Sequence, residues 1–451
     1  MSIHPLNTKE RMREETMGLF SFGKKKKEAA KPIERFEVKK IKEKSYMLAI
    51  PKHPEELKDV NMIMDRIKNA TDFRLLQMGQ NEEGTPWHEI EYKGEKYEFL
   101  IYPENYRIPE MFRVQHFFAD VDVEEIDKQN TGLIVAMDFS ENSLESYHLQ
   151  LKIINTIFPE TLAVLDYGSE KVLSGTWVSY AAKSKTPPAP RYLFTAQAVY
   201  TGKDVWLHTH GLNRCGIMEL EVLGSTKETS QSHYRVLEAM ASRLIDEPDA
   251  LDNEGAMYVA RLCNNQPLVA TWIPWQQAMG MIKKGTLGGP VDRNDESGHN
   301  GYTGCIYVYQ SPDDMENRKY SHLSVYDKLL ENNPMFMYTN EETDRLRTLA
   351  IERVEYMKKA FLNGAQAVLI KVGLKIDEEH RTETNEREHI WFELKSVAED
   401  TFTAQLTQEP YMVSGMHEGD MGTYPYEDIT DWLIFTDQKR ISPDDIYLLE
   451  K

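Results

Sequence analysis

The sequence is short of cysteine, of long apolar runs and of positive charge, and each shortage excludes a class of protein. Cys215, Cys263 and Cys305 are the only cysteines in 451 residues. Their odd number and wide spacing provide neither a disulfide framework nor a C-x-x-C redox or zinc pair, so a reducing, cytoplasmic compartment is expected. No apolar run approaches the roughly 20 residues that span a bilayer, and no transmembrane segment is predicted.

Acidic side chains outnumber basic ones. Asp and Glu total 73 against 53 Lys and Arg, which gives a net charge of -20. Because neutralisation of phosphates supplies most of the affinity for nucleic acid, this chain is not expected to bind nucleic acid. With 41% hydrophobic and 28% charged residues, the composition indicates a folded globular protein. At roughly 100–200 residues per domain, the length predicts two to four domains.

The first 44 residues are expected to form a flexible basic tail. The apolar patch from Met17 to Gly23 precedes four lysines, and the natural start is either Met1 or Met17. A secretory signal would place its charges before a longer apolar core, and Phe22 stands where a myristoylation motif requires Ser or Thr. A solvated tail is favoured, and weak membrane-surface contact through Phe20, Phe22 and the lysines is the alternative.

Strands and helices alternate after the tail, without a strict strand–helix–strand rhythm. Short apolar or alternating runs predict strands, and apolar residues at helical spacing predict helices. Strands are expected over 45–50, 87–92, 97–102, 132–139, 162–167, 192–200, 205–210, 256–263, 268–273 and 305–309. Helices are expected over 55–69, 142–158, 232–245 and 340–361, the last capped by Asn340 and closed by Gly364. The pattern predicts an α+β fold with mixed or antiparallel sheets and packed helices.

Two changes in composition divide the folded part of the chain. The proline-rich turn Thr186–Pro190 predicts a first domain boundary, and the composition changes again near Gln366. We therefore expect one α+β domain over 45–188, a second over 189–363, and a small β-rich C-terminal module over 364–451.

The C-terminal module carries four landmarks in a recognisable order. They are Glu-His-Ile-Trp-Phe-Glu from Glu388, Glu409-Pro410, Gly419-Asp420 and Ile-Thr-Asp-Trp from Ile429. Together they resemble the bacterial domain-of-unknown-function family 2314, and the landmark side chains to follow are His389, Trp391, Asp420, Asp431 and Trp432. Trp206–Gly216, followed by Glu219–Glu221, is similar to family 4026, which often precedes that module. The resemblance implies a bacterial cytosolic origin and brings no catalytic residues.

One constellation in the body suggests chemistry. Val205–Gly211 and Gly216–Val222 are expected to form two arms of a hairpin. Because side chains alternate along a strand, Trp206, His208 and His210 share one face, and Glu219 and Glu221 fall on that same face. If Gly211 pairs with Gly216, His208 lies directly opposite Glu219.

This face has two interpretations. His208, His210 and Glu219, with Cys215 at the turn as a fourth ligand, are suited to zinc or ferrous iron. The alternative, which we favour because H-x-H is common, is a cross-strand His–Glu hydrogen bond shielded by Trp206 or by another domain. No resident cofactor is predicted on the favoured interpretation.

Other motifs are weaker. The glycine-rich stretch Lys284–Gly301 contains neither a phosphate loop nor a dinucleotide turn, and is predicted to be a surface loop or a lid over a ligand. Trp272–Trp275 is predicted to anchor a core or a domain contact. Asp431 and Trp432 suit either a peptide-binding surface or a strand with a buried Trp.

The favoured function is a non-catalytic, cytoplasmic protein–protein interaction or regulatory protein with an unidentified protein partner. Two alternatives remain. One is a metal-dependent, hydrolase-like enzyme that uses His208, His210 and Glu219. The other is an immunity-type protein that neutralises a toxin through its acidic surface.

Overall fold

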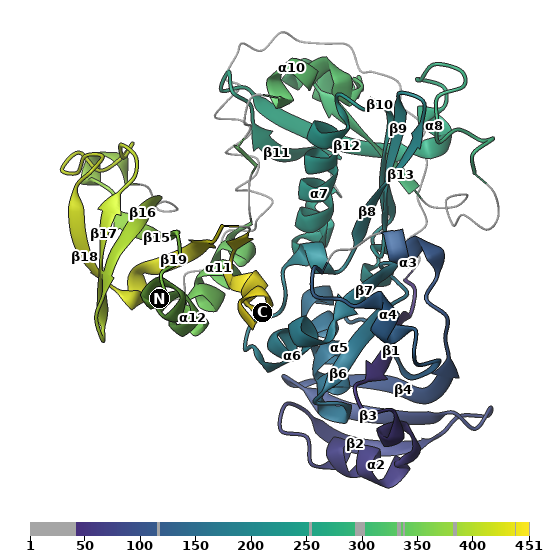
Figure 1. Cartoon of the computed structure of the whole chain (residues 1–451). Coiled ribbons are helices and arrows are strands. Elements are labelled where there is room, and N and C mark those ends of the chain that lie inside the picture. The colour runs from purple at the N-terminus through teal and green to yellow at the C-terminus, as the bar shows by residue number, and fades with distance from the viewer. Residues whose placement is uncertain are drawn as a thin grey trace, which may run out of the picture. The chain divides into compact units, whose positions relative to one another are not determined.

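The computed structural model describes residues 42–114, 118–251, 255–293, 303–331, 335–336, 339–381, 386–437 and 439–450. The chain divides into two compact units, and each is described by itself (Figure 1). Residues 196–337 form the unit called here the inserted unit. Residues 43–195 and 338–451 form the discontinuous unit, because the chain leaves it and later returns to it. The predicted tail lies outside the described residues as far as residue 41.

The N-terminal part of the discontinuous unit is built on an antiparallel sheet. Within the described residues its seven strands follow the order β2-β3-β4-β5-β1-β6-β7. The strands are β1 (Ser45–Pro51), β2 (Arg74–Gln80), β3 (Pro86–Tyr92), β4 (Glu95–Asn105), β5 (Thr131–Met137), β6 (Thr161–Asp166) and β7 (Lys171–Ser174). The helices are α2 (Val60–Lys68), α3 (Glu110–Val114), α4 (Val123–Ile126), α5 (Ser143–Ile157) and α6 (Gly175–Lys183). The predicted strands β3, β4 and β5 and the predicted helix α5 are confirmed.

The single helix expected over 55–69 is wrong. A 3₁₀ turn, η1 (Pro54–Lys58), ends before α2 begins. The Asp59 carboxylate accepts a hydrogen bond from the Met62 N–H at 2.9 Å, so it starts a new helix at that point. The buried residues of α2 are Ile63 and Ile67, whereas Val60 at its start is 65% exposed.

The inserted unit contains a mixed sheet. Its described strands follow the order β14-β11-β12-β13-β10-β9-β8. They are β8 (Thr195–Thr201), β9 (Asp204–His210), β10 (Glu219–Thr226), β11 (Met257–Arg261), β12 (Pro267–Pro274), β13 (Thr303–Tyr309) and β14 (Met335–Phe336). β10 and β13 run parallel. The helices are α7 (Ser230–Asp246), α8 (Trp275–Ala278), α9 (Pro312–Glu316) and α10 (Asp327–Leu330), and α7 packs on β9 and β10. The strand expected from 192 begins later, because Pro190–Tyr192 forms a 3₁₀ turn, η2.

The C-terminal part of the discontinuous unit is a second antiparallel sheet with two helices on one face. The strand order is β18-β17-β16-β15-β19-β20. The strands are β15 (Ala367–Lys375), β16 (Arg387–Val397), β17 (Thr401–Leu406), β18 (Met421–Pro425), β19 (Ile429–Phe435) and β20 (Arg440–Ile441). The helices are α11 (Asn340–Glu352), α12 (Val354–Leu362) and the 3₁₀ segment η8 (Pro443–Glu450). Residues of α11 and α12 complete the apolar core under this sheet.

The long helix predicted over 340–361 is wrong in two details. Arg353 departs from helical geometry with φ -105° and separates α11 from α12. The cap is Thr339 rather than Asn340, because the Thr339 hydroxyl accepts the Glu342 N–H at 3.0 Å. Gly364 follows α12 with φ +84°, as a closing glycine requires.

A buried charge cluster joins the two parts of the discontinuous unit. The Arg345 guanidinium donates to Asp444 at 2.9 Å and to Glu342 at 2.6 Å. Burial opposes the charge on Arg345, but the two carboxylates outweigh it and raise its pKa. Arg353 donates to the Tyr180 carbonyl of α6 at 3.0 Å, and Tyr447 of η8 stacks edge-on against Phe118. The segment η8 therefore holds α11 against the N-terminal part.

The sheets confirm the predicted α+β class with antiparallel and mixed sheets. The domain boundaries at 188 and 363 stay predictions. No helix in the described stretches is long and apolar enough to cross a membrane.

Candidate functional site

The histidine-bearing hairpin forms two residues out of the predicted register. β9 and β10 pair with His208 opposite Glu221 and Leu207 opposite Val222. The prediction that His208 lies opposite Glu219 is therefore wrong. The connection contains a 3₁₀ turn, η3 (Asn213–Cys215), and β10 begins only at Glu219, so the loop is longer than the assumed turn. A shift of two residues preserves which side chains share a face.

Glu219 closes this loop from within. Its carboxylate accepts the N–H groups of Gly211 at 2.9 Å and Asn213 at 3.1 Å, and the Thr209 hydroxyl at 2.7 Å. Burial raises the pKa of Glu219 to about 7, while these hydrogen bonds lower it. The carboxylate thus binds the backbone of its own loop.

Glu221 is held by a buried arginine that the sequence did not indicate. Arg293 donates from Nη1 to Oε1 at 2.9 Å and from Nη2 to Oε2 at 2.5 Å, and Trp206 Nε1 donates to Oε2 at 3.0 Å. Both charged side chains are 0% exposed. The guanidinium carbon lies 5.2 Å from the Trp206 ring centroid and 4.3 Å from that of Trp275. The ion pair is therefore enclosed by two aromatic rings.

Of the remaining predicted ligands, His208 and Cys215 are buried and His210 is partly exposed. The His208 ring centroid lies 4.6 Å from that of Trp206 and 5.0 Å from that of His210. Burial lowers the pKa of His210 to about 4, so this ring is neutral at pH 7. Cys215 is buried with Sγ 4.0 Å from the Gly211 carbonyl. Among the described residues, no three His, Cys, Asp or Glu side chains are grouped to hold a metal ion.

The described part of the glycine-rich stretch packs on this cluster. Gly288 has φ +86°, and a Cβ at this position would lie 2.6 Å from Leu223 and 2.9 Å from Trp206. Trp275 and Leu287 pack against the same apolar cluster. Residues 294–301 of the predicted loop lie outside the described residues.

A second hydrogen-bonded chain in the inserted unit went unrecognised in the sequence. Ser225 Oγ lies 2.7 Å from His233 Nδ1, and His233 Nε2 lies 2.8 Å from Asp327. These are the groups of a serine hydrolase, but the exposure is reversed. Ser225 is 1% exposed and His233 0%, whereas the Asp327 side chain is 29% exposed. A nucleophile must reach its substrate, so these three hydrogen-bonded side chains instead connect α7 to β10 and to α10.

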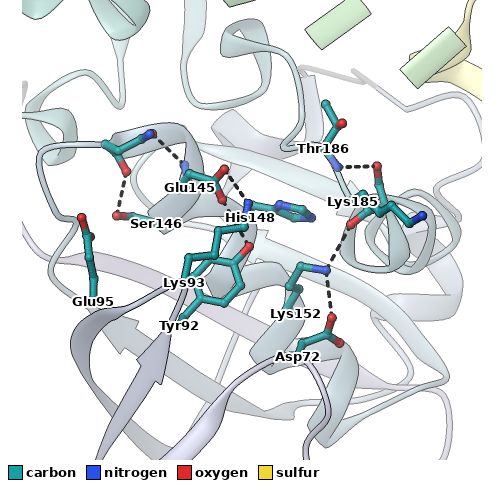
Figure 2. A network of polar contacts seen from close by, with 12 residues as sticks. Asp72, Tyr92, Lys93, Glu95, Glu145, Ser146, His148, Lys152, Lys185 and Thr186 are labelled. Atoms are coloured by element: carbon teal, nitrogen blue, oxygen red, sulfur yellow. Dashed lines mark hydrogen bonds and ion pairs between the residues drawn. The ribbon is translucent and has the colours of Figure 1, made fainter. Parts of the chain in front are cut away.

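Figure 2 shows a polar network around α5. The Lys152 ammonium donates to the carbonyls of Ala182 at 2.5 Å and Ser184 at 3.1 Å, and lies 3.2 Å from Asp72. It satisfies carbonyls at the end of α6 that have no helical partner. His148 donates from Nε2 to the Ala181 carbonyl at 3.0 Å, and burial lowers the pKa of His148 to about 3. This network also serves the interior.

The landmarks of the C-terminal module lie on both faces of its sheet and in one of its turns. Trp432 is completely buried in the core, and its Nε1 donates to the Ala350 carbonyl of α11 at 3.0 Å. Asp420 accepts the His417 N–H at 2.8 Å in the turn before β18. His389, Trp391 and Asp431 lie on the opposite face, which we call the outer face because α11 and α12 cover the other one.

Three side chains form a row across the outer face. Trp391 of β16 lies opposite Lys371 of β15, and Lys371 lies opposite Asp431 of β19. The Lys371 ammonium is 5.5 Å from the Trp391 ring centroid. Burial raises the pKa of Asp431 to about 6, and the Trp432 N–H and Lys371 oppose this shift. We call Trp391, Lys371 and Asp431 the outer row; all three are half-buried.

Two surface hollows lie elsewhere. One of about 30 Å³ in the inserted unit has room only for water. An open groove of about 510 Å³ lies between α12 and the β16–β17 turn. It is lined by Glu355, Lys358, Lys359, Leu362, Asn363, Val397, Ala398 and Glu399.

The molecule is thus a multidomain α+β protein. Among the landmarks of its C-terminal module, His389, Trp391 and Asp431 lie together on the outer face. Residues 45–188 match the N-terminal domain, and residues 196–307 the C-terminal domain, of the protein of unknown function DUF4026. Residues 342–447 match DUF2314, described as an uncharacterized protein conserved in bacteria. The chain belongs to the DUF4026 family and carries a DUF2314 domain, which confirms both resemblances. No curated protein and no solved structure matches it.

Proposed function

We propose that this is a non-catalytic, cytoplasmic protein that binds a protein partner through the outer face of its C-terminal sheet. The observation that carries the proposal is the outer row. It combines an aromatic ring, an ammonium and a carboxylate on neighbouring strands of one rigid sheet.

The burial pattern of the strands supports this role. Inward side chains of β15, β16, β17 and β19 are buried, while the outward ones between them are half-buried or exposed. Leu369 and Leu433 lie opposite each other beside the outer row and widen its apolar part. A tryptophan beside aliphatic and charged groups is typical of the residues that dominate binding energy at protein interfaces.

The inserted unit offers less support for the hydrolase alternative. Glu219 and Glu221 both accept hydrogen bonds from neighbours inside that unit, which favours a structural role for the histidine face. The immunity-type alternative still rests only on the acidic net charge of -20 and on the modular layout of the chain.

The test is affinity capture with the full chain from a lysate of cells that make it. Trp391→Ala is compared with the wild type and with Tyr411→Ala, which removes an aromatic ring that is 85% exposed and outside the outer row. We expect a partner whose recovery falls about tenfold or more with Trp391→Ala and is unchanged with Tyr411→Ala.

Thermal unfolding of each variant controls for misfolding, and Trp391→Phe should restore most of the recovery. Equal recovery with wild type and a folded Trp391→Ala would contradict the proposal. So would the absence of any protein enriched above a tag-only control.

A further inference from the structure

We infer that the partner presents to the outer face an extended acidic segment with apolar side chains between its carboxylates. This inference rests on the proposed function and adds the chemistry of the partner.

The outer face differs in sign from the rest of the chain. Five basic and two acidic side chains lie at outward positions of the strands of the C-terminal sheet, and the acidic Asp428 lies just before β19. The whole chain, by contrast, has 53 basic and 73 acidic residues. The basic side chains are Lys371, Lys375, Arg387, Lys395 and Arg440, and the acidic ones are Glu393 and Asp431. Complementary charge guides encounter and selects partners, so an acidic partner is favoured.

The positive charge is concentrated near His389. Burial lowers the pKa of His389, and the charges of Lys371, Arg387 and Arg347 lower it further. His389 and Arg387 lie over Gly373, where a Cβ would approach each of them to 3.3 Å. Lys371 and Arg387, which lie on the outer face beside this imidazole, form a place where a carboxylate is attracted.

The ion pairs on the face and at its edge leave it open to competition. Arg387 lies 3.2 Å from Asp428, and Lys395 lies 2.8 Å from Glu393. The Arg387 and Asp428 side chains are 41% and 30% exposed. Exposed pairs of this kind contribute little to stability, so an incoming carboxylate can exchange with them.

The spacing of the face suits an extended segment. Leu369 and Lys371 are alternate outward residues of β15, and Trp391 and Glu393 are alternate outward residues of β16. Alternate side chains of a strand lie about 7 Å apart, which is also the side-chain repeat of an extended peptide. Because only every second side chain of an extended segment faces the sheet, a segment with acidic and apolar residues at successive same-face positions, as in Glu-Ser-Leu-Ser, would place a carboxylate near Lys371 and an aliphatic group near Leu369 and Leu433.

The test uses labelled probes and the full chain in fluorescence polarisation. The probes are an octapeptide of two Glu-Ser-Leu-Ser repeats, called here the Glu–Leu peptide, its counterpart with Lys in place of Glu, called the Lys–Leu peptide, and a thymidine oligonucleotide. We expect the Glu–Leu peptide to bind most tightly and to weaken as salt is added. Lys371→Gln combined with Arg387→Gln should weaken it about tenfold. Lys358→Gln combined with Lys359→Gln, on the helix side of the same module, should leave it unchanged.

The outcomes separate the two proposals. Equal or tighter binding of the Lys–Leu peptide, lost in Trp391→Ala, would overturn the acidic partner and leave protein binding intact. Tighter binding of the oligonucleotide would overturn both. Failure of both peptides to bind would overturn the inference, while the capture experiment decides the proposed function by itself. Glu–Leu binding that survives the Lys371→Gln, Arg387→Gln change would also overturn the inference.

Discussion

Replacement of Arg293 by methionine should strongly destabilise the inserted unit. The side chains of Arg293 and Glu221 are both 0% exposed, and the guanidinium makes two hydrogen bonds to the carboxylate. Methionine fills much of the same volume, but it removes both of these hydrogen bonds. The buried Glu221 carboxylate then keeps the hydrogen bond from Trp206 Nε1 without a counter-charge from residue 293. Removal of one member of a buried pair costs about 3–5 kcal/mol, because the other charge stays desolvated.

A substitution of Glu221 separates the effect of the unpaired buried charge from a loss of packing. Glu221→Gln alone should also destabilise, since the buried guanidinium then lacks a counter-charge. The double variant Arg293→Met, Glu221→Gln should cost clearly less than the sum of the single changes. Coupling of about 2 kcal/mol or more is expected for groups in direct contact within one network.

The assay is hydrogen exchange with mass spectrometry on peptides from β9 and β10. It reports local opening of the inserted unit, whereas a single transition need not describe a chain of several domains. Lys284→Met, an exposed lysine of the same stretch, is the control and should change stability by less than about 0.5 kcal/mol. An effect of Arg293→Met below about 1 kcal/mol would refute the reasoning, as would strict additivity.

Three further changes test other buried groups. The pKa of Glu219, about 7, lies above its ordinary value, so the contribution of this side chain to stability is complete below pH 4.5 and is lost as the pH rises through 7. Urea titrations at increasing pH should show the wild type losing about 3 kcal/mol relative to Glu219→Gln. The lowered pKa of His148, about 3, has the opposite effect, because its contribution to stability is complete above pH 6.5 and falls as the pH drops toward 3. Thermal scans should show a weaker dependence of stability on pH in His148→Gln. Lys152→Met strands the Ala182 and Ser184 carbonyls and should cost about 2–3 kcal/mol in urea unfolding, with exposed Lys183→Met near zero.

The periodicity of the sequence predicted elements and faces better than their mutual positions. Alternation correctly indicated that His208 and Glu221 share a face, because the side-chain period of a strand is a local property. The register depended on η3 and on the contacts that Glu219 makes with the loop backbone. Arg293 lies 72 residues from Glu221, and no local pattern indicates that they pair.

The outer row also combines a local property, which the sequence predicts, with a long-range property, which it does not. His389 and Trp391 were selected as landmarks, and their spacing alone places them on one face of a strand. The alignment of Lys371 and Asp431 with Trp391 depends on the strand order β16-β15-β19, which is a long-range property. The buried polar side of α5 escaped prediction as well, because Gln150 and Lys152 find their partners on other elements.

Photocrosslinking within the cell examines the outer face in the intact protein. A photoreactive phenylalanine analogue at Thr403, an outward position of β17, would lie on the outer face, and the same analogue at Lys359 of α12 would lie on the helix-covered side. Protein binding through the outer face predicts a discrete crosslinked species from Thr403, lost when Trp391→Ala is added, and none from Lys359. The same species from both positions, or none from Thr403, would contradict it.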